Sequence, residues 1–195
     1  MLNEFVEGFD IELFLSMPSF AKKIRYANEK LQKLAVGSAR IIYRIDDKKV
    51  LKLAKNSKGI AQNEVESDHL LNDWYGEIIA KVLESDSEDR WIISEFAKKV
   101  TPTRFKQLLG VTVDEFSNYL SNDTKTLLHF SIKDDVKKVL ESSEFYEKVR
   151  DMVGNFDMEI GDFRRINSFG EIDGRLVIRD YGLTTSVYKQ YYSRK

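Results

Sequence analysis

The chain has 195 residues, a formal net charge of −1 and no cysteine. The balanced charge gives no global attraction to nucleic acid or to an anionic membrane. The lack of thiols excludes disulfides, thiolate nucleophiles and cysteine-bound zinc. With 42 % hydrophobic and 32 % charged residues, the composition is typical of a globular protein with one domain or two lobes.

Acidic residues open the N-terminus, and no basic start followed by an apolar run of the signal-peptide type is present. No stretch approaches the roughly 18 apolar residues that a membrane span requires. We therefore expect a cytoplasmic protein that has neither a membrane nor a nucleic-acid partner. His69 and His129 lack a second histidine at metal-ligand spacing, and we expect both to be structural.

Two helices are predicted at the N-terminus. Phe5, Phe9 and Leu13 recur every four residues, which indicates a short amphipathic helix. Ser19 can cap a second helix, whose apolar stripe runs from Phe20 to Leu31. We expect both helices to brace the sheet that follows, with a docking surface as the alternative.

A half with five antiparallel strands and one inserted helix is predicted next. Branched residues between turn sequences favour strands, and the inserted helix extends from about residue 59 to Tyr75. The expected strands are residues 34–36, 41–45, 50–54, 78–84 and 91–96.

The remaining chain is predicted to be mostly helical from Pro102 to Gly154. A small β-hairpin then turns at Asp173-Gly174, a dipeptide typical of two-residue hairpin turns. The fold class is thus α+β, with a five-stranded antiparallel first lobe and a short, mostly helical second lobe. The expected domains are an N-terminal helical extension at 1–33, a first lobe at 34–98 and a second lobe at 99–195.

Three polar residues near the end of the chain have the pattern of a phosphoryl-transfer site. Asp162 and Asn167 are five residues apart, and the predicted hairpin returns Asp180 beside them. Phosphoryl transfer needs a placed carboxylate for the acceptor hydroxyl and oxygen ligands for Mg²⁺. These residues supply both.

At these positions the chain resembles the protein-kinase-like superfamily. Asp162 and Asn167 match its catalytic-loop Asp and Asn, and Asp180-Tyr181-Gly182 matches its Asp-Phe-Gly motif with Tyr in place of Phe. Gly161 before the Asp is similar to the aminoglycoside and choline kinase branch. That branch usually has His where this chain has Glu159.

The resemblance implies a role for a lysine of the third strand. Lys52 would hold the α- and β-phosphates of ATP, and a glutamate of the next helix would be its partner. We favour Glu66, because Leu70 and Trp74 follow at four-residue steps and would place it on the buried face. Glu64 remains an alternative.

Two further elements have counterparts in the family. Gly37 and Ser38 lie where its glycine-rich loop lies, and small residues there let backbone N–H groups approach phosphate. Backbone groups near Glu95 and Ala97 would bond the adenine edge, as in the family's hinge. By the same resemblance, Asn167 and Asp180 would bind Mg²⁺.

Each motif alone has an ordinary explanation as a turn, a strand position or a solvated surface charge. It is their conjunction, in the right order, that favours the kinase-like fold. Only 13 residues follow Gly182, so we expect a minimal second lobe rather than a conventional Ser/Thr protein kinase. The run Lys58–Asn63 is similar to small kinase-like proteins of bacteria and their phages.

Three functions stay open. The first is an ATP- and Mg²⁺-dependent phosphotransferase whose hydroxyl acceptor is a small molecule, a host protein or the chain itself. The second is an inactive, nucleotide-binding pseudokinase with a regulatory role. The third is a scaffold that binds a protein partner, for which Tyr188, Tyr191 and Tyr192 are contact candidates; packing is their default role.

Overall fold

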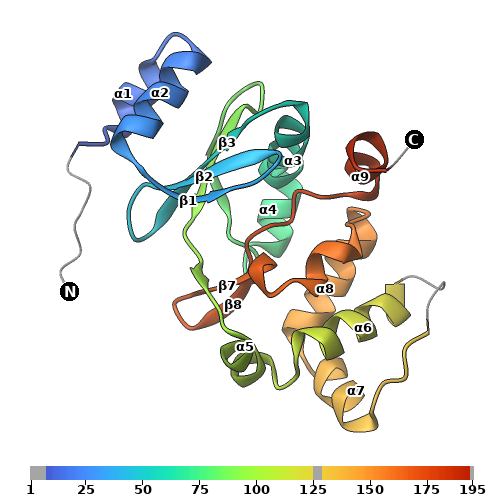
Figure 1. Cartoon of the computed structure of the whole chain (residues 1–195). Coiled ribbons are helices and arrows are strands. Elements are labelled where there is room, and N and C mark those ends of the chain that lie inside the picture. Colours follow the sequence, from blue (N-terminus) through green and yellow to red (C-terminus); the bar gives the residue numbers. More distant parts are fainter. Residues whose placement is uncertain (1–7, 125–128, 194–195) are drawn as a thin grey trace. The chain divides into compact units, whose positions relative to one another are not determined.

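The computed structural model describes residues 8–124 and 129–193, which form two compact units (Figure 1). The first unit consists of the chain up to Ser67 together with Lys81–Phe96. The second consists of Asp68–Ala80 and the chain from Ala97 onward. The divisions after residues 33 and 98 that the sequence suggested stay a prediction.

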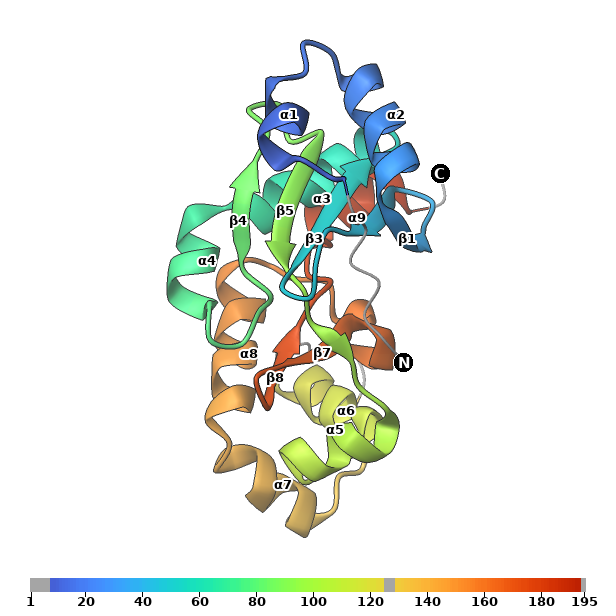
Figure 2. The ribbon, with the colours of Figure 1, turned by 90° about the vertical axis from the view of Figure 1, so that its left-hand side faces the viewer.

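The first unit is a five-stranded antiparallel sheet with the strand order β1-β2-β3-β5-β4. Figure 2 shows β4 beside β5 at one edge of this sheet. The α+β class and the five-stranded antiparallel sheet are therefore confirmed. Its elements are α1 (Ile11–Ser16), α2 (Phe20–Lys30), β1 (Gln32–Val36), β2 (Arg40–Arg44), β3 (Lys49–Ala54), α3 (Ser57–Ser67), β4 (Val82–Ser85) and β5 (Trp91–Glu95).

The two faces of this sheet bury different residues. Leu51 and Leu53 of β3 join Phe14 of α1 in an apolar core that α1 and α2 cover. Because successive strand residues alternate between faces, Val50 and Lys52 point to the other face. The helix α3 packs against β3, β4 and β5. The N-terminal helices thus brace the face opposite Lys52.

The apolar stripe predicted for the first helix was wrong. Phe5 lies outside the described residues, and α1 begins only after Asp10, whose Oδ1 accepts a hydrogen bond from the Leu13 N–H at 3.0 Å. Leu13 is 48 % exposed, whereas Phe14 is fully buried. The cap fixes where the helix begins, and the helix then turns Phe14 rather than Leu13 toward the sheet.

The single helix predicted up to Tyr75 is in fact two helices. Asp68 has an extended ψ of 123°, and its side chain caps α4 (His69–Tyr75) by accepting from the Leu71 N–H at 3.1 Å. The helix α4 belongs to the second unit, and its Leu70 and Trp74 are 41 % and 60 % exposed. These two residues therefore do not continue the buried face of α3.

The strand predicted at 78–84 was too early. Only Val82–Ser85 forms β4 in the first sheet. The preceding residues pair in the second unit, where the Ala80 N–H donates to Ile178 at 2.8 Å and the Ile178 N–H donates to Ile78 at 2.7 Å. The apolar run is therefore divided between two units, which its composition alone does not reveal.

The second unit is mostly helical and contains a small three-stranded sheet, β6-β7-β8. The predicted hairpin is present, with Asp173 and Gly174 at φ values of 49° and 81°, as a two-residue hairpin turn requires. The two-residue strand β6 was not predicted. The elements after α4 are β6 (Lys98–Lys99), α5 (Pro102–Leu109), α6 (Val113–Thr124), α7 (Asp134–Glu141), α8 (Glu144–Asn155), the 3₁₀ helices η1 (Ile160–Arg164) and η2 (Ile166–Ser168), β7 (Phe169–Ile172), β8 (Arg175–Ile178) and α9 (Thr185–Tyr191).

Aromatic side chains form the centre of the second unit. Phe116 contacts Phe105, Tyr146 and Phe169 edge to face, with ring centroids 5.8 to 6.1 Å apart. Such contacts join α5, α6, α8 and β7. The hairpin that carries Asp180 is therefore fixed to the helices by its first residue.

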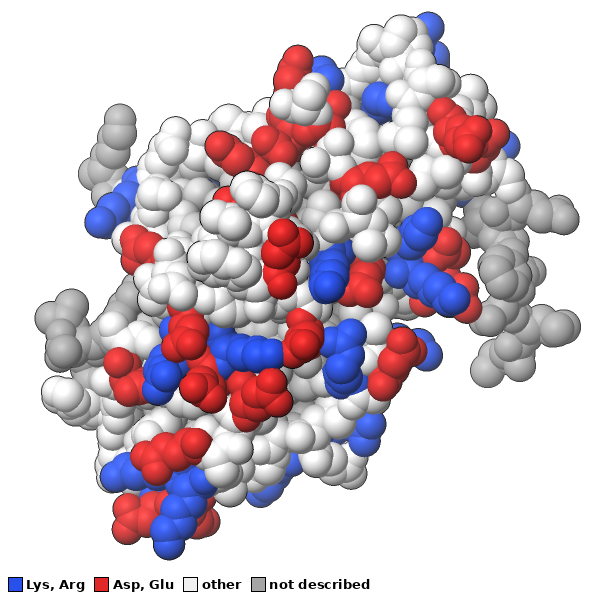
Figure 3. Space-filling model, turned by 180° about the vertical axis from the view of Figure 1, so that it is seen from behind, with Lys and Arg blue, Asp and Glu red and all other residues white. Residues whose placement is uncertain are grey.

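Acidic and basic side chains are interspersed on the face shown in Figure 3. Within residues 8–124 and 129–193, no helix is both long enough and apolar enough to cross a membrane.

A glycine in α3 tests how closely this helix packs on the sheet. A Cβ at Gly59 would lie 2.3 Å from the Ala39 carbonyl oxygen and 2.9 Å from Ala54 Cα, both of which are backbone atoms. We expect Gly59→Ala to lower the free energy of unfolding by about 3 kcal/mol, because the backbones must separate. A Cβ at Gly154 in α8 meets nothing within 4 Å, so Gly154→Ala should raise it by up to ~1 kcal/mol. Urea unfolding measures both, and equal effects would contradict the close packing.

Candidate functional site

The turn between β1 and β2 is short. The Gly37 N–H donates to the Arg40 carbonyl at 2.9 Å, which leaves Ser38 and Ala39 at the tip. Gly37 does not have a positive φ, and a Cβ there would make only an ordinary contact, 3.6 Å from the Arg40 oxygen. The fold therefore does not require glycine at this position.

A buried carboxylate lies between two cations in the first unit. Lys52 Nζ on β3 is 2.5 Å from Glu66 Oε2, and Arg40 Nη2 on β2 is 2.7 Å from Glu66 Oε1. The side chains of Lys52, Glu66 and Arg40 are 5 %, 0 % and 6 % exposed. We call these three residues the Glu66 cluster.

The structure pairs Lys52 with Glu66 and leaves Glu64 exposed. The buried face of α3 consists of Gly59, Asn63 and Glu66, at the spacing of one helix face. The preference for Glu66 thus agrees with the structure, but the reason drawn from Leu70 and Trp74 does not. The face is set upstream, where Gly59 lets the helix approach the sheet.

Arg40 is a member of the Glu66 cluster that was not predicted from the sequence. Its Nη1 donates to Asn63 Oδ1 at 3.2 Å, and Asn63 Nδ2 in turn donates to the Asp89 carbonyl at 2.8 Å. A signal was present, because Arg40 is two residues before Ile42, and Ile42 pairs with Lys52. Paired residues and residues two apart share a face, so Arg40 had to lie on the same face as Lys52.

Electrostatics keep Glu66 ionised. Burial by itself raises the pKa of Glu66, but attraction and hydrogen bonds from Arg40 and Lys52 outweigh it, and the pKa lies below the ordinary value. A buried carboxylate is tolerated only when cations and donors compensate for lost hydration. The Glu66 cluster meets that requirement with one cation on each oxygen.

A buried hydroxyl lies on the same face as Lys52. Ser94 of β5 pairs with Val50, and its Oγ has no hydrogen-bond partner among the described residues. Glu95, the next residue, receives the Lys81 N–H on its Oε2 at 3.0 Å and donates its own N–H to the Lys81 carbonyl at 2.9 Å. Ala97, the other predicted hinge residue, belongs to the second unit. The adenine-bonding role of Glu95 and Ala97 stays a prediction.

The predicted catalytic loop is a pair of 3₁₀ helices in the second unit. Asp162 lies in η1 and is partly buried, while Asn167 lies in η2. Phe163 is 1 % exposed and anchors η1 in the core. The Arg165 N–H donates to the Asp162 carbonyl at 3.3 Å, which closes the turn between them.

The hairpin brings Asp180 to the same end as Asn167. Phe169 pairs with Ile178, and beyond that pair the Arg179 N–H donates to the Ser168 carbonyl at 2.8 Å. Arg179 Nε also donates to the Asn167 carbonyl at 2.9 Å. Burial lowers the pKa of Arg179 and the neighbouring Asp180 opposes that shift. The structure thus gathers two oxygen-bearing side chains at one end of the hairpin.

The tyrosine of the Asp-Tyr-Gly motif has a bonding partner that phenylalanine would lack. Tyr181 is 1 % exposed, and its hydroxyl donates to the Ala80 carbonyl at 2.9 Å. This bond satisfies the buried hydroxyl and fixes the residue that follows Asp180. The substitution therefore has a structural explanation within the second unit.

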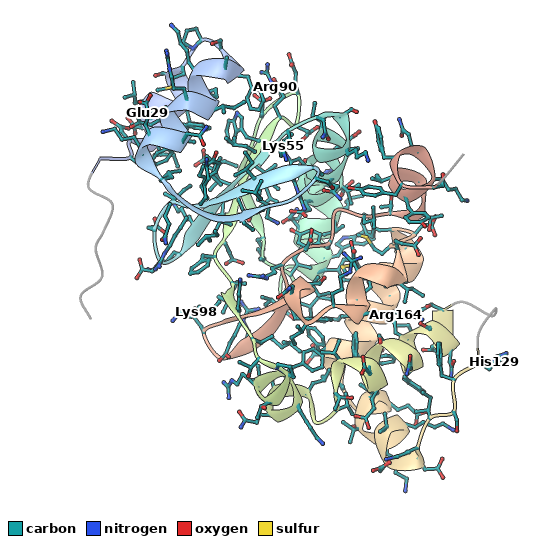
Figure 4. All side chains as sticks on the ribbon, in the orientation of Figure 1. Glu29, Lys55, Arg90, Lys98, His129 and Arg164 are labelled. Atoms are coloured by element: carbon teal, nitrogen blue, oxygen red, sulfur yellow. The ribbon has the colours of Figure 1, made fainter. Side chains whose placement is uncertain are left out.

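Arg164 and the two histidines have no predicted role in the site. Arg164 stacks over the Phe130 ring at 5.5 Å and is 3.4 Å from Ser121 Oγ of α6 (Figure 4). His69 and His129 are exposed.

The donors suit one class of metal ion. Among the described residues, no group of three or more His, Cys, Asp or Glu side chains is placed to hold a metal. Asn167 and Asp180 offer an amide and a carboxylate oxygen, and Mg²⁺ is typically held by one or two such groups together with phosphate oxygens and water. The residues present therefore fit Mg²⁺ that arrives with a phosphate-bearing ligand.

The chain is similar in fold to several solved structures. An ADP-bound aminoglycoside phosphotransferase has 16 % identity and a TM-score of 0.42, over 84 % of this chain and 71 % of that one. A choline/ethanolamine kinase family protein from Mesorhizobium loti has 16 % identity and a TM-score of 0.41, over 87 % and 65 %. SAICAR synthase from Saccharomyces cerevisiae has 14 % identity and a TM-score of 0.37, over 77 % and 73 %.

Neither a protein-family model nor a curated protein matches the chain significantly. The likeness to the solved structures is one of fold alone.

The Glu66 cluster predicts an acid-sensitive fold. Because the pKa of Glu66 is lowered by folding, its contribution to stability is complete above the unfolded value of about 4.3 and is lost as the pH falls through the folded pKa. We expect Glu66→Gln to lower the free energy of unfolding by about 3 kcal/mol or more at neutral pH, because two buried cations lose their counter-charge.

The exposed Glu64 is the matched control, and Glu64→Gln should change stability by less than about 0.5 kcal/mol. Urea unfolding between pH 3 and pH 7 measures both variants. If Glu66→Gln kept the steep acid dependence of the unsubstituted protein, Glu66 would not be its source.

Proposed function

We propose that the chain binds ATP with Mg²⁺ and transfers the γ-phosphoryl group to a hydroxyl acceptor. The observation that carries this proposal is the buried pairing of Lys52 with Glu66. A buried ion pair is weak evidence for stability, because an apolar replacement is often as stable. A lysine held in a fixed position by a carboxylate is well suited to bind phosphate oxygens.

In this proposal Lys52 orients the α- and β-phosphates. Glu66 fixes the direction of its ammonium group, and Arg40 keeps the second carboxylate oxygen paired. When Lys52 turns toward phosphate, Glu66 is therefore not left as an uncompensated buried charge. The Gly37–Arg40 turn contributes backbone N–H groups to the phosphates.

The second unit supplies the remaining groups. Asn167 and Asp180 hold Mg²⁺, which neutralises charge on the phosphate oxygens when it is bound. Asp162 accepts the proton of the acceptor hydroxyl. Its backbone lies in η1, which the buried Phe163 anchors in the core. The acceptor is a small molecule, a host protein or the chain itself.

A pseudokinase is the second candidate, and the short turn favours it. The turn has a single glycine, Gly37, and only two tip residues. It therefore has less backbone than a longer glycine-rich loop with which to surround the phosphates. Such a protein would bind nucleotide without turnover and act through a partner. A scaffold without nucleotide binding is the remaining alternative.

Nucleotide binding is tested by thermal unfolding with and without ATP and Mg²⁺. A ligand at 100 times its Kd stabilises the native state by about 2.7 kcal/mol, which should raise the Tm by roughly 5–10 °C in a chain of this size. Lys52→Ala should abolish most of the rise, and Asp180→Ala should abolish the part that requires Mg²⁺. Lys33→Ala, at an exposed site on β1, is the charge-matched control. A rise that persists in both site variants would refute the assignment.

Catalysis is tested by the isosteric variant Asp162→Asn. We expect it to retain the ATP-dependent rise in Tm and to lose phosphoryl transfer or ATP hydrolysis by about 10²–10⁴-fold, because only the proton acceptor is removed. Release of phosphate from labelled ATP measures this. A wild-type protein that binds ATP but never turns it over would establish the pseudokinase instead.

A further inference from the structure

The four carbonyl oxygens of the Gly37–Arg40 turn all accept hydrogen bonds, three of them from Lys55 and Asn56. Lys55 Nζ donates to the Gly37 carbonyl at 2.8 Å, and Asn56 Nδ2 donates to the Ser38 carbonyl at 3.0 Å. The Lys55 N–H donates to the Ala39 carbonyl at 2.7 Å, while the Arg40 carbonyl accepts from Gly37. Figure 4 shows Lys55 beside the tip of the β1–β2 hairpin.

The N–H groups at the tip of the turn differ from its carbonyl groups in their hydrogen bonding. Within the described part of the chain, the N–H groups of Ser38 and Ala39 have no hydrogen-bond acceptor. Successive N–H groups in a turn form a concavity that binds anions. The carbonyl groups of the turn are occupied, while its tip N–H groups belong to the exposed Ser38 and to Ala39, which is 5 % exposed. The turn therefore offers donors rather than acceptors.

Asn56 connects this turn to the start of α3. Its Oδ1 accepts from the Lys58 and Gly59 N–H groups at 3.1 and 3.4 Å, while its Nδ2 holds Ser38. One amide thus fixes the turn to the helix that carries Glu66. The absence of a Cβ at Gly59 lets the Ala39 carbonyl approach this helix.

We propose that Lys55 and Asn56 are positioning residues that present the Ser38 and Ala39 N–H groups to a nucleotide phosphate, with Lys55 adding a cation beside them. This inference rests on the proposed function. Lys55 and Asn56 lie in the connection between β3 and α3, and we call these two residues the clamp. The clamp fixes the conformation of a turn that has a single glycine.

The proposal separates phosphate recognition from nucleoside recognition. A side chain that only supports the fold would affect ADP and adenosine alike, and it would lower the Tm without ligand. A clamp for a phosphate-binding turn affects ADP selectively. The exposed Lys55 contributes little to stability, because exposed lysine contacts are weak.

The test compares Mg²⁺-ADP and adenosine binding by calorimetry in four variants of the whole chain. We expect Lys55→Met to weaken ADP binding about tenfold and to leave adenosine unchanged. Lys55→Arg should restore most of the affinity for ADP. Asn56→Ser keeps a helix cap but loses the Nδ2 donor, and it should weaken ADP binding about fivefold. Lys33→Met removes the same charge from an exposed β1 position and should change neither ligand. In the unsubstituted protein, ADP should shift the Ser38 and Ala39 amide signals in NMR spectra, and adenosine should not.

The experiment distinguishes failure of this inference from failure of the proposed function. If the unsubstituted protein binds no ADP, the proposed function fails and the inference fails with it. If it binds ADP while Lys55→Met binds within twofold of it, the inference is wrong and the proposed function stands. Equal losses for ADP and adenosine would show that the clamp serves only the fold, which also overturns the inference.

Discussion

The carboxylate of Glu66 is shared by two buried cations, and the arrangement of the first unit depends on this sharing. Lys52 enters from β3 and Arg40 from β2, so that one helix residue links two neighbouring strands. Each charge would be costly to bury alone, and together they are tolerated only in this geometry. The position of α3 on the sheet is therefore fixed by electrostatics as much as by apolar packing.

The packing around α3 supports the position of the Glu66 cluster. Gly59 allows backbone contact with Ala39 and Ala54, and Asn63 connects Arg40 to the Asp89 carbonyl. On the other face of the sheet, the N-terminal helices bury Leu51 and Leu53. The opposite face carries the Glu66 cluster together with apolar side chains such as the buried Ile92, which pairs with Lys52. It also carries the hydroxyl of Ser94, which has no hydrogen-bond partner among the described residues. The charged network of the Glu66 cluster is thus confined to one face of the sheet.

The second unit uses backbone geometry rather than buried charge. The β7–β8 register brings Asn167 and Asp180 to one end of the hairpin, and the Arg179 side chain holds the backbone of Asn167. The Tyr181 hydroxyl anchors the motif through Ala80. These bonds place oxygen-bearing side chains with little cost in desolvation, because Asp180 remains exposed. Such an arrangement suits a metal ion that arrives together with its phosphate ligand.

Local periodicity and turn chemistry were sufficient to predict the α+β class, the five-stranded antiparallel sheet and the hairpin at Asp173-Gly174, whereas the order of the motifs was predicted from the family resemblance. The folded chain was needed to show that α3 ends before Asp68, that Ile78 and Ala80 pair with Ile178, and that Arg40 joins Lys52 at Glu66. The strand partner and the counter-ion lie far away in the sequence, and even the short-range cap of Asp68 on the Leu71 N–H outweighs the local propensity that predicted one continuous helix.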